Sequence, residues 1–193
     1  MTRERILGGG FFMLLACLLC ACAGRAAPEP MRDVLRRNSL ERIDAYLTRV
    51  TGGTLQLIDY EHAVRTFADR AKDIEYVHLA SEDCYIPVTK SIALTQAQAR
   101  ECVAVMSRLI RNQKGGIALC HEPHHYLVLK FTPPESDPYD GDYSIDFSIC
   151  FSCRNFEVNT PGCEFGGPLG EVQADVRRLF VALGAPVAEM QGE

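Results

Sequence analysis

The segment from Tyr143 to Phe151 constrains the fold more than any other part of this 193-residue chain. Apolar and polar residues alternate along it, and successive side chains of a β-strand point to opposite faces of a sheet. One face would carry five large apolar side chains, Tyr143, Ile145, Phe147, Ile149 and Phe151. The other face would carry Ser144, Asp146, Ser148 and Cys150. We therefore expect a strand whose first face is buried in the core.

A partner for this strand precedes it in the chain. Tyr126 to Thr132 is also apolar, and Asp140-Gly141 in the connection favours a turn, because glycine accepts positive φ without steric cost. The two segments predict an antiparallel hairpin. A further strand is expected over 154–158, and shorter extended segments over 54–58, 74–79, 84–88, 91–94 and 117–119.

Helical patterns flank these strands. Thr95 and Gln98 form a capping box, and an apolar stripe at helical spacing follows them. Ser39 predicts the N-cap of a helix that ends at Gly52-Gly53, and further helices are expected over 61–71 and 171–183. No βαβ repeat occurs. The order predicts an α+β fold, with an antiparallel meander or hairpin sheet packed against helices in a single small domain behind an N-terminal leader.

The leader has the pattern of an export signal. Arg3 and Arg5 precede an apolar segment from Ile6 to Ala21. The sequences LLAC (14–17) and LCAC (19–22) resemble the lipobox of bacterial lipoproteins, and the resemblance covers only the leader. It implies a diacylglyceryl group, and palmitate among the acyl chains, on Cys22 or alternatively on Cys17. An uncleaved membrane anchor over 6–24 and a plain signal peptide are the other interpretations.

Lipidation would decide where the protein resides. Two acyl chains anchor a protein stably, so we expect attachment to the membrane of the cell envelope through Cys22. In a Gram-negative source, the lipoprotein resemblance and Ala23 would favour the outer membrane, with the body facing the periplasm. The expected divisions are a lipoprotein signal peptide (1–22), a tether (23–38), the α+β domain (39–184) and a tail (185–193).

Six cysteines lie in the body, and an oxidising compartment favours disulfides among them. Cys102 lies on an apolar helix face and is expected to be buried. The candidates for a disulfide, or alternatively for zinc or copper ligands, are Cys120, Cys150, Cys153 and Cys163. Cys150 and Cys153 form a CxxC motif. In one uninterrupted strand their side chains would point to opposite faces, so their joint action requires a turn at 152–155.

Histidines next to Cys120 are candidate metal ligands, namely His121, His124 and His125. Residues 121–125 match HExxH, which binds zinc only on a helix. Pro123 and the strand pattern that follows instead favour a polar loop.

The CHEP and CFSC segments, with a hairpin between them, resemble uncharacterised exported bacterial proteins that carry a CxxP…CFxC pattern. The resemblance covers about residues 91–183 and implies key positions at Cys120, Pro123, Cys150 and Cys153, with no known activity.

The functional expectation follows from these observations. Net charge of −5 and the absence of a basic patch exclude a nucleic-acid partner. We expect a lipid-anchored envelope protein, a non-catalytic binding or structural domain with an envelope protein as partner, no catalytic residue and no cofactor. The alternative is a periplasmic metal-binding or thiol-redox protein that uses Cys120, Cys150 and Cys153.

Overall fold

The computed structural model describes residues 31–79, 82–112, 122–133, 143–160 and 163–187, with side chains from residue 37 onward except those of 163 and 164. The chain divides into two units, residues 1–36 and 37–193, and the second unit contains the whole sheet. The helices are α2 (Met31–Leu47), α3 (Gln96–Arg111) and α4 (Gln173–Ala182), and the 3-10 turns are η1 (Tyr60–His62), η2 (Phe67–Asp69) and η3 (Gly170–Val172). The strands are β1 (Val50–Ile58), β2 (Tyr76–Leu79), β3 (Cys84–Leu94), β4 (His125–Phe131), β5 (Ser144–Cys150), β6 (Asn155–Thr160) and β7 (Cys163–Pro168).

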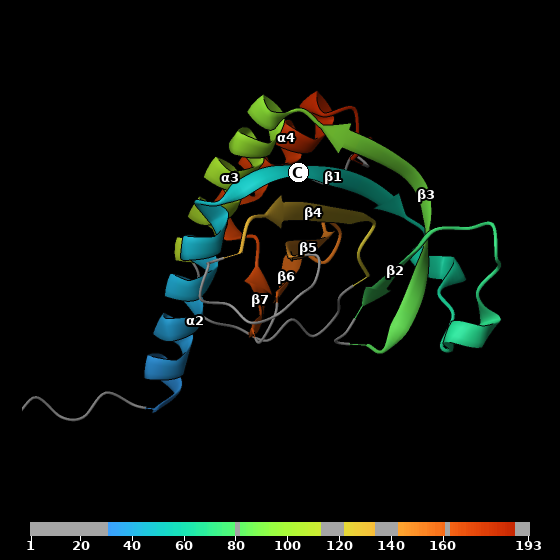
Figure 1. Ribbon diagram of the computed structural model, residues 1–193, viewed down its shortest axis with the longest axis horizontal. Coiled ribbons are helices and arrows are strands. Elements are labelled where there is room, and N and C mark those ends of the chain that lie inside the picture. Colours follow the sequence, from blue (N-terminus) through green and yellow to red (C-terminus); the bar gives the residue numbers. More distant parts are fainter. Residues whose placement is uncertain (1–30, 80–81, 113–121, 134–142, 161–162, 188–193) are drawn as a thin grey trace, which may run out of the picture. The chain divides into compact units, whose positions relative to one another are not determined.

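The strands form one seven-stranded sheet in the order β2-β3-β1-β4-β5-β6-β7, and every neighbouring pair is antiparallel. Figure 1 shows the sheet curling along its length. The curl has a local cause in the long strand β3, whose first half pairs with β2 and whose second half pairs with β1. A register shift at Leu57/Ile58 lies at this changeover, and such bulges bend a sheet. The expected α+β fold is confirmed.

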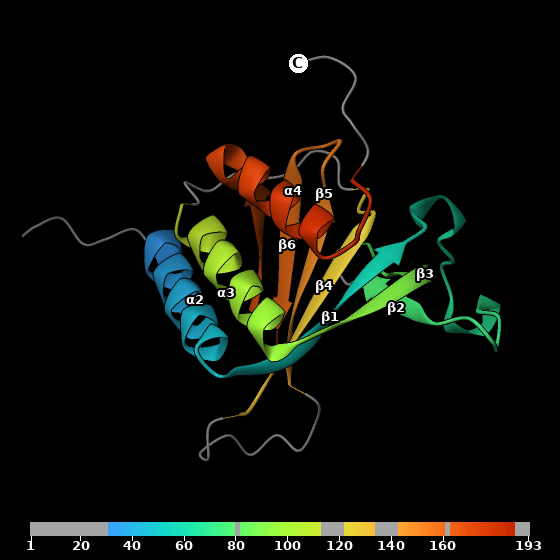
Figure 2. The same ribbon diagram turned by 90° about the horizontal axis from the view of Figure 1, so that it is seen from above.

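The three helices lie over one face of the sheet (Figure 2). Between them and the sheet lies the main core, to which α2 contributes Ile43 and Leu47. All five apolar residues of the alternating segment 143–151 are buried, as the sequence predicts. The capping box also forms, since Thr95 Oγ1 accepts from the Gln98 amide at 3.3 Å and Gln98 Oε1 accepts from the Thr95 amide at 2.9 Å.

Several expected elements are wrong. Helix α2 begins at Met31, so Ser39 lies inside it and is not its N-cap. The two glycines at 52–53 belong to β1 and do not end the helix. The expected helix over 61–71 is replaced by the short 3-10 turns η1 and η2, because Val64 between them pairs with Tyr85 in an isolated bridge through two 2.8 Å backbone hydrogen bonds. Segments 84–88 and 91–94 are one strand, and β7 was not expected.

The helix-free face of the sheet has a smaller core at one end. There the β2–β3 hairpin curls toward β1 and β4, and its side chains bury Ile58 and Tyr126 together with Val77, Leu79, Cys84 and Ile86. The rest of this face carries mainly polar residues, with Val128 among them.

Candidate ligand-binding cavity

A row of side chains crosses four strands on the helix-free face. Thr54 of β1 pairs with Val128 of β4, Val128 pairs with Asp146 of β5, and Asp146 pairs with Asn159 of β6. Paired residues on adjacent strands point to the same face, so the register places all four on one surface. Their neighbours in sequence, such as Leu55 and Phe147, point into the helix-covered core.

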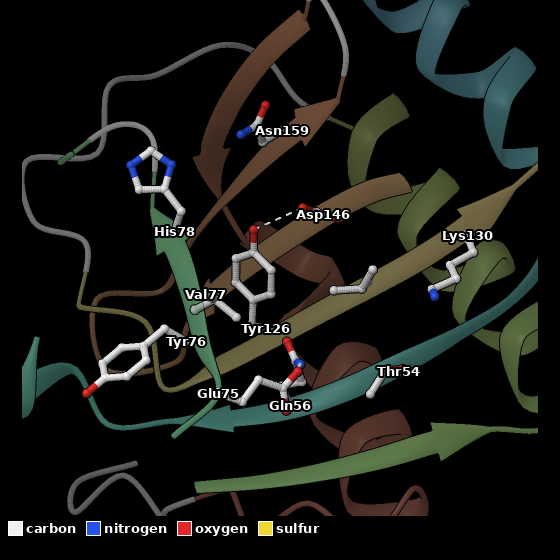
Figure 3. A pocket seen from close by; sticks show the side chains of 11 residues that line it. Thr54, Gln56, Glu75, Tyr76, Val77, His78, Tyr126, Lys130, Asp146 and Asn159 are labelled. Atoms are coloured by element: carbon white, nitrogen blue, oxygen red, sulfur yellow. Dashed lines mark hydrogen bonds between the residues drawn. The ribbon is translucent and has the colours of Figure 1, made fainter. Parts of the chain in front are cut away.

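This surface forms the floor of a cavity of about 480 Å³. The β2 segment provides its other side, with Tyr76, Val77 and His78 (Figure 3). The full lining is Thr54, Gln56, Glu75, Tyr76, Val77, His78, Tyr126, Val128, Lys130, Asp146 and Asn159. The curl of the sheet creates the cavity, because it brings β2 over strands that are distant from it in the sheet order.

Gln56 is the most buried amide of the lining, with 7% of its surface exposed. Its Nε2 donates to Glu75 Oε1 at 2.7 Å, and Glu75 Oε2 accepts from Ser91 Oγ at 3.1 Å. These contacts fix the orientation of the amide. The Oε1 of Gln56 is buried and has no hydrogen-bond partner in the part of the chain that the structure describes.

Asp146 is a second acceptor of this kind. Tyr126 Oη donates to Asp146 Oδ2 at 3.1 Å, as the dashed line in Figure 3 shows. Within the described residues, Oδ1 is buried without a partner. Burial raises the pKa of Asp146 above 3.8, against smaller lowering effects from Ser144 and Tyr126. Burial, followed by the charge of Asp146, also raises the pKa of Tyr126, so its hydroxyl remains a donor.

The burial of these two oxygens without hydrogen-bond partners lowers the stability of the folded protein. A buried polar group without a partner costs about 1–3 kcal/mol, against a total stability of about 5–15 kcal/mol for a typical domain. Both residues line the same cavity, so the two unpartnered oxygens lie beside a space that a ligand can occupy.

Asp146→Asn should raise the stability of the protein at neutral pH by about 1 kcal/mol, because the buried charge is removed. The folded-state pKa of Asp146 is raised, so the wild-type folded state binds a proton more readily than the unfolded state and gains stability as pH falls. The advantage of the variant should shrink as pH falls through the raised pKa toward 3.8. Thermal melting from pH 7 to pH 4 measures this, and a less stable variant at pH 7 would contradict it.

The cysteines of the CxxC lie at the other end of β5. The expected turn forms after Cys150, with Arg154 at φ 56°, and the Cys153 amide donates to Cys150 Sγ at 3.1 Å. Within the described residues, no disulfide joins Cys84, Cys102, Cys150 and Cys153 to one another, and Cys102 is fully buried as expected. Burial is the main reason why the pKa of Cys150 is raised to about 11.

Other sequence-predicted sites are only partly described. Cys22, Cys120 and His121 lie outside the described residues, and so does the side chain of Cys163. Disulfide pairing and metal binding by these residues therefore stay predictions. Across the described ranges, from residue 37 to 187 with their gaps, no group of three His, Cys, Asp or Glu side chains is placed to hold a metal ion.

The two described histidines of the HExxH match have different surroundings. His124 is exposed, whereas His125 belongs to β4 and is buried with 5% exposure. His125 Nε2 donates to the Pro186 carbonyl at 2.9 Å, and its ring packs on Phe151 and Phe180. Burial lowers the pKa of His125, so the imidazole is neutral at neutral pH. Because His125 lies in a strand, this end of the match lacks the helix that a zinc protease requires.

The cavity lining was missed by sequence reasoning, apart from the grouping of Asp146 with Ser144 and Ser148 on one strand face. A signal was nevertheless present. Gln56 lies between Leu55 and Leu57, and aspartate is rare inside strands, so both residues are unusual for the strands that hold them.

The fold and the cavity together define the chain as an α+β domain with a concave, polar site on the open face of its sheet. No protein-family model, curated protein or solved structure matches the chain. Among the helices of the described residues, none has the length and apolar character that crossing a membrane requires.

Proposed function

We propose that this protein is a non-catalytic binding protein of the cell envelope, held at the membrane by an acyl-cysteine at Cys22, whose body binds a small polar ligand in the cavity between β2 and the centre of the sheet. The observation that carries the proposal is the cavity of about 480 Å³ that has Gln56 and Asp146 in its lining. Ligand sites of proteins have volumes of about 300–1,000 Å³, with apolar and aromatic walls and a few polar groups that fix the ligand.

The lining combines these two kinds of surface, with more polar than apolar residues. Tyr76, Tyr126 and Val128 provide aromatic and aliphatic surface, and the polar groups come from the neighbouring strands. The floor is rigid, because its residues belong to hydrogen-bonded strands of the sheet and not to loops. A site on such elements is held ready for a ligand.

The raised pKa of Cys150 favours a binding function over thiol chemistry. A thiol whose pKa is raised to about 11 is protonated at neutral pH, and the protonated thiol is a poor nucleophile and a poor metal ligand. A disulfide oxidoreductase needs the opposite shift, a lowered thiol pKa.

Val128→Phe should abolish ligand binding, because the larger ring enters the cavity from the centre of its floor. The full chain in mild detergent is tested by thermal shift with a broad panel of small amines, amino acids, carboxylates, alcohols and sugars. A ligand at about 100 times its Kd adds about 2.7 kcal/mol to stability, which raises the melting temperature measurably.

The matched control is Val181→Phe, the same change at a site on α4 that is 56% exposed. Thr54→Tyr provides a second way to fill the cavity if Val128→Phe folds poorly. A panel without any binder, or a binder that is unaffected by both cavity variants, would refute the proposal.

Cys22→Ala should remove the membrane anchor. Cells that express the full chain with radiolabelled palmitate should yield a labelled wild-type protein in the membrane fraction and an unlabelled variant. Cys17→Ala is the control, since the second lipobox match ends there. If the label is retained in Cys22→Ala but lost in Cys17→Ala, the acylated residue is Cys17. If the label is retained in both variants, acylation at these positions is refuted.

A further inference from the structure

The polar groups at the floor of the cavity have an excess of hydrogen-bond acceptors. The Gln56 amide donates to Glu75, and the Tyr126 hydroxyl donates to Asp146, so both of these donors are already used. Gln56 Oε1 and Asp146 Oδ1 accept no hydrogen bond from the described residues. An ionised carboxylate can only accept. A ligand that completes this part of the cavity must therefore donate.

The charges of the lining also favour a ligand that donates hydrogen bonds, because they are mainly negative near Gln56. Asp146 and Glu75 are two carboxylates of the lining, and the described part of the chain provides no Lys, Arg or His side chain in an ion pair with either of them. The groups that hydrogen-bond to Asp146 and Glu75 belong to neutral side chains, namely Tyr126, Ser144, Gln56 and Ser91. Glu75 is exposed, whereas Asp146 is held away from water. A carboxylate in the position of Asp146 is costly without a cation, and an ammonium group offsets this cost.

The geometry allows contact after a small rotation. In the structure both unpartnered oxygens are covered by protein atoms. The terminal torsions of Asp and Gln side chains have broad, shallow minima, so rotation can turn an oxygen toward the cavity without a change of backbone. Such a rotation exchanges the present contact with Tyr126 or Glu75 for a contact with the ligand. The ring of Tyr126 lies between Asp146 and Gln56 in Figure 3, and aromatic faces attract cations.

We infer that the ligand of this cavity is a small organic ammonium compound whose N–H groups donate to Asp146 and Gln56. The inference rests on the proposed function and adds the chemical class of the ligand. Among the described lining residues, Lys130 is the one fixed cation, and it is exposed at the edge of the floor. Its flexible four-carbon stem lets the ammonium group move into solvent when a cation binds.

Three compounds with the same four-carbon skeleton test the inference. They are 1,4-diaminobutane, which is a dication at neutral pH, 1,4-butanediol, which is neutral, and succinate, which is a dianion. Calorimetric titration of the full chain in mild detergent should show that 1,4-diaminobutane binds about tenfold or more tightly than the other two, because a charge-assisted hydrogen bond contributes about 1.5–3 kcal/mol. Equal or tighter binding of butanediol or succinate would overturn the inference.

Asp146→Asn should weaken the binding of 1,4-diaminobutane about tenfold or more, because the substitution removes the charge and keeps the shape of the side chain. The control is Glu101→Gln, which removes one negative charge from the exposed surface of α3 on the other side of the sheet and should leave the affinity unchanged. Unchanged binding in Asp146→Asn would overturn the inference. An equal loss in Glu101→Gln would show attraction by net charge alone, which also overturns it.

The cavity variants separate failure of the inference from failure of the proposed function. If succinate or a sugar binds and Val128→Phe abolishes this binding, the cavity is a ligand site but its ligand is not an ammonium compound. If 1,4-diaminobutane binds equally to wild type, Val128→Phe and Thr54→Tyr, it binds elsewhere, and both proposals are wrong.

Discussion

Phe147→Ala should destabilise the protein by about 3–5 kcal/mol, the range for removing a large aromatic side chain from a packed core. Phe147 is fully buried at the centre of β5, where its strand neighbours Leu127 and Val158 are also fully buried. The loss is a large fraction of the roughly 5–15 kcal/mol that holds a typical domain folded. Denaturant unfolding measures it as a lower transition midpoint with an unchanged slope.

Two comparison variants establish that the effect comes from the core. Phe67→Ala makes the same chemical change at a ring that is 66% exposed, where the Arg70 guanidinium lies 3.3 Å from the ring centroid. It should cost less than about 1 kcal/mol, the value of an exposed cation–π contact. Phe147→Leu keeps most of the volume and should cost about 1.5 kcal/mol or less. A loss below about 1 kcal/mol in Phe147→Ala would mean that the core lies elsewhere.

Gly53→Ala should separate β1 from β4. A Cβ at residue 53 would lie 2.4 Å from the backbone oxygen of Val128, a contact that real Cβ atoms do not make. Because this oxygen belongs to the neighbouring strand, relief requires a backbone shift and not a side-chain rotation. We expect a loss of about 1–3 kcal/mol or more in unfolding experiments. The shift would also move the cavity floor, so ligand binding should weaken.

The neighbouring glycine is a matched control for this substitution. A Cβ at Gly52 would have no atom within 4 Å, so Gly52→Ala should change stability by less than about 0.5 kcal/mol. The two variants have the same composition and lie on the same strand. If they were equally stable, the close approach of β1 to β4 would be wrong.

The central hairpin could be predicted from the sequence because its signal is local. Alternation along residues 143–151 has the period of a strand, and the burial of its apolar face follows directly. The capping box at Thr95 is equally local, since both partners lie within one turn. Such features require no knowledge of the rest of the chain.

The expected helix over 61–71 failed for the opposite reason. Its apolar spacing is helical, but Val64 instead pairs with Tyr85 on β3, which the local pattern does not contain. The side chain of Phe67 in this segment is exposed and stacks with Arg70. Tertiary pairing overrides local propensity in such short segments.

The cavity was beyond sequence reasoning because it depends on the strand order. Asp146 and Asn159 lie on the neighbouring strands β5 and β6, but Thr54 on β1 joins them only because β1 pairs with β4. The β2 side of the cavity depends further on the curl of β3. Asp146 could be assigned to a strand face from the sequence, but not to a site.

The central position of β1 has a consequence for how the chain is made. Residue 54 pairs with residue 128, which is 128 − 54 = 74 positions later, whereas β5, β6 and β7 form a local meander. During synthesis or export from the N-terminus, β1 emerges first and waits for β4, with a row of unpaired amides and carbonyls that other chains can join. Pairings over such long sequence separations also form slowly. The N-terminal half of this protein is therefore the part that most needs protection from aggregation until β4 has been synthesised and has paired with β1.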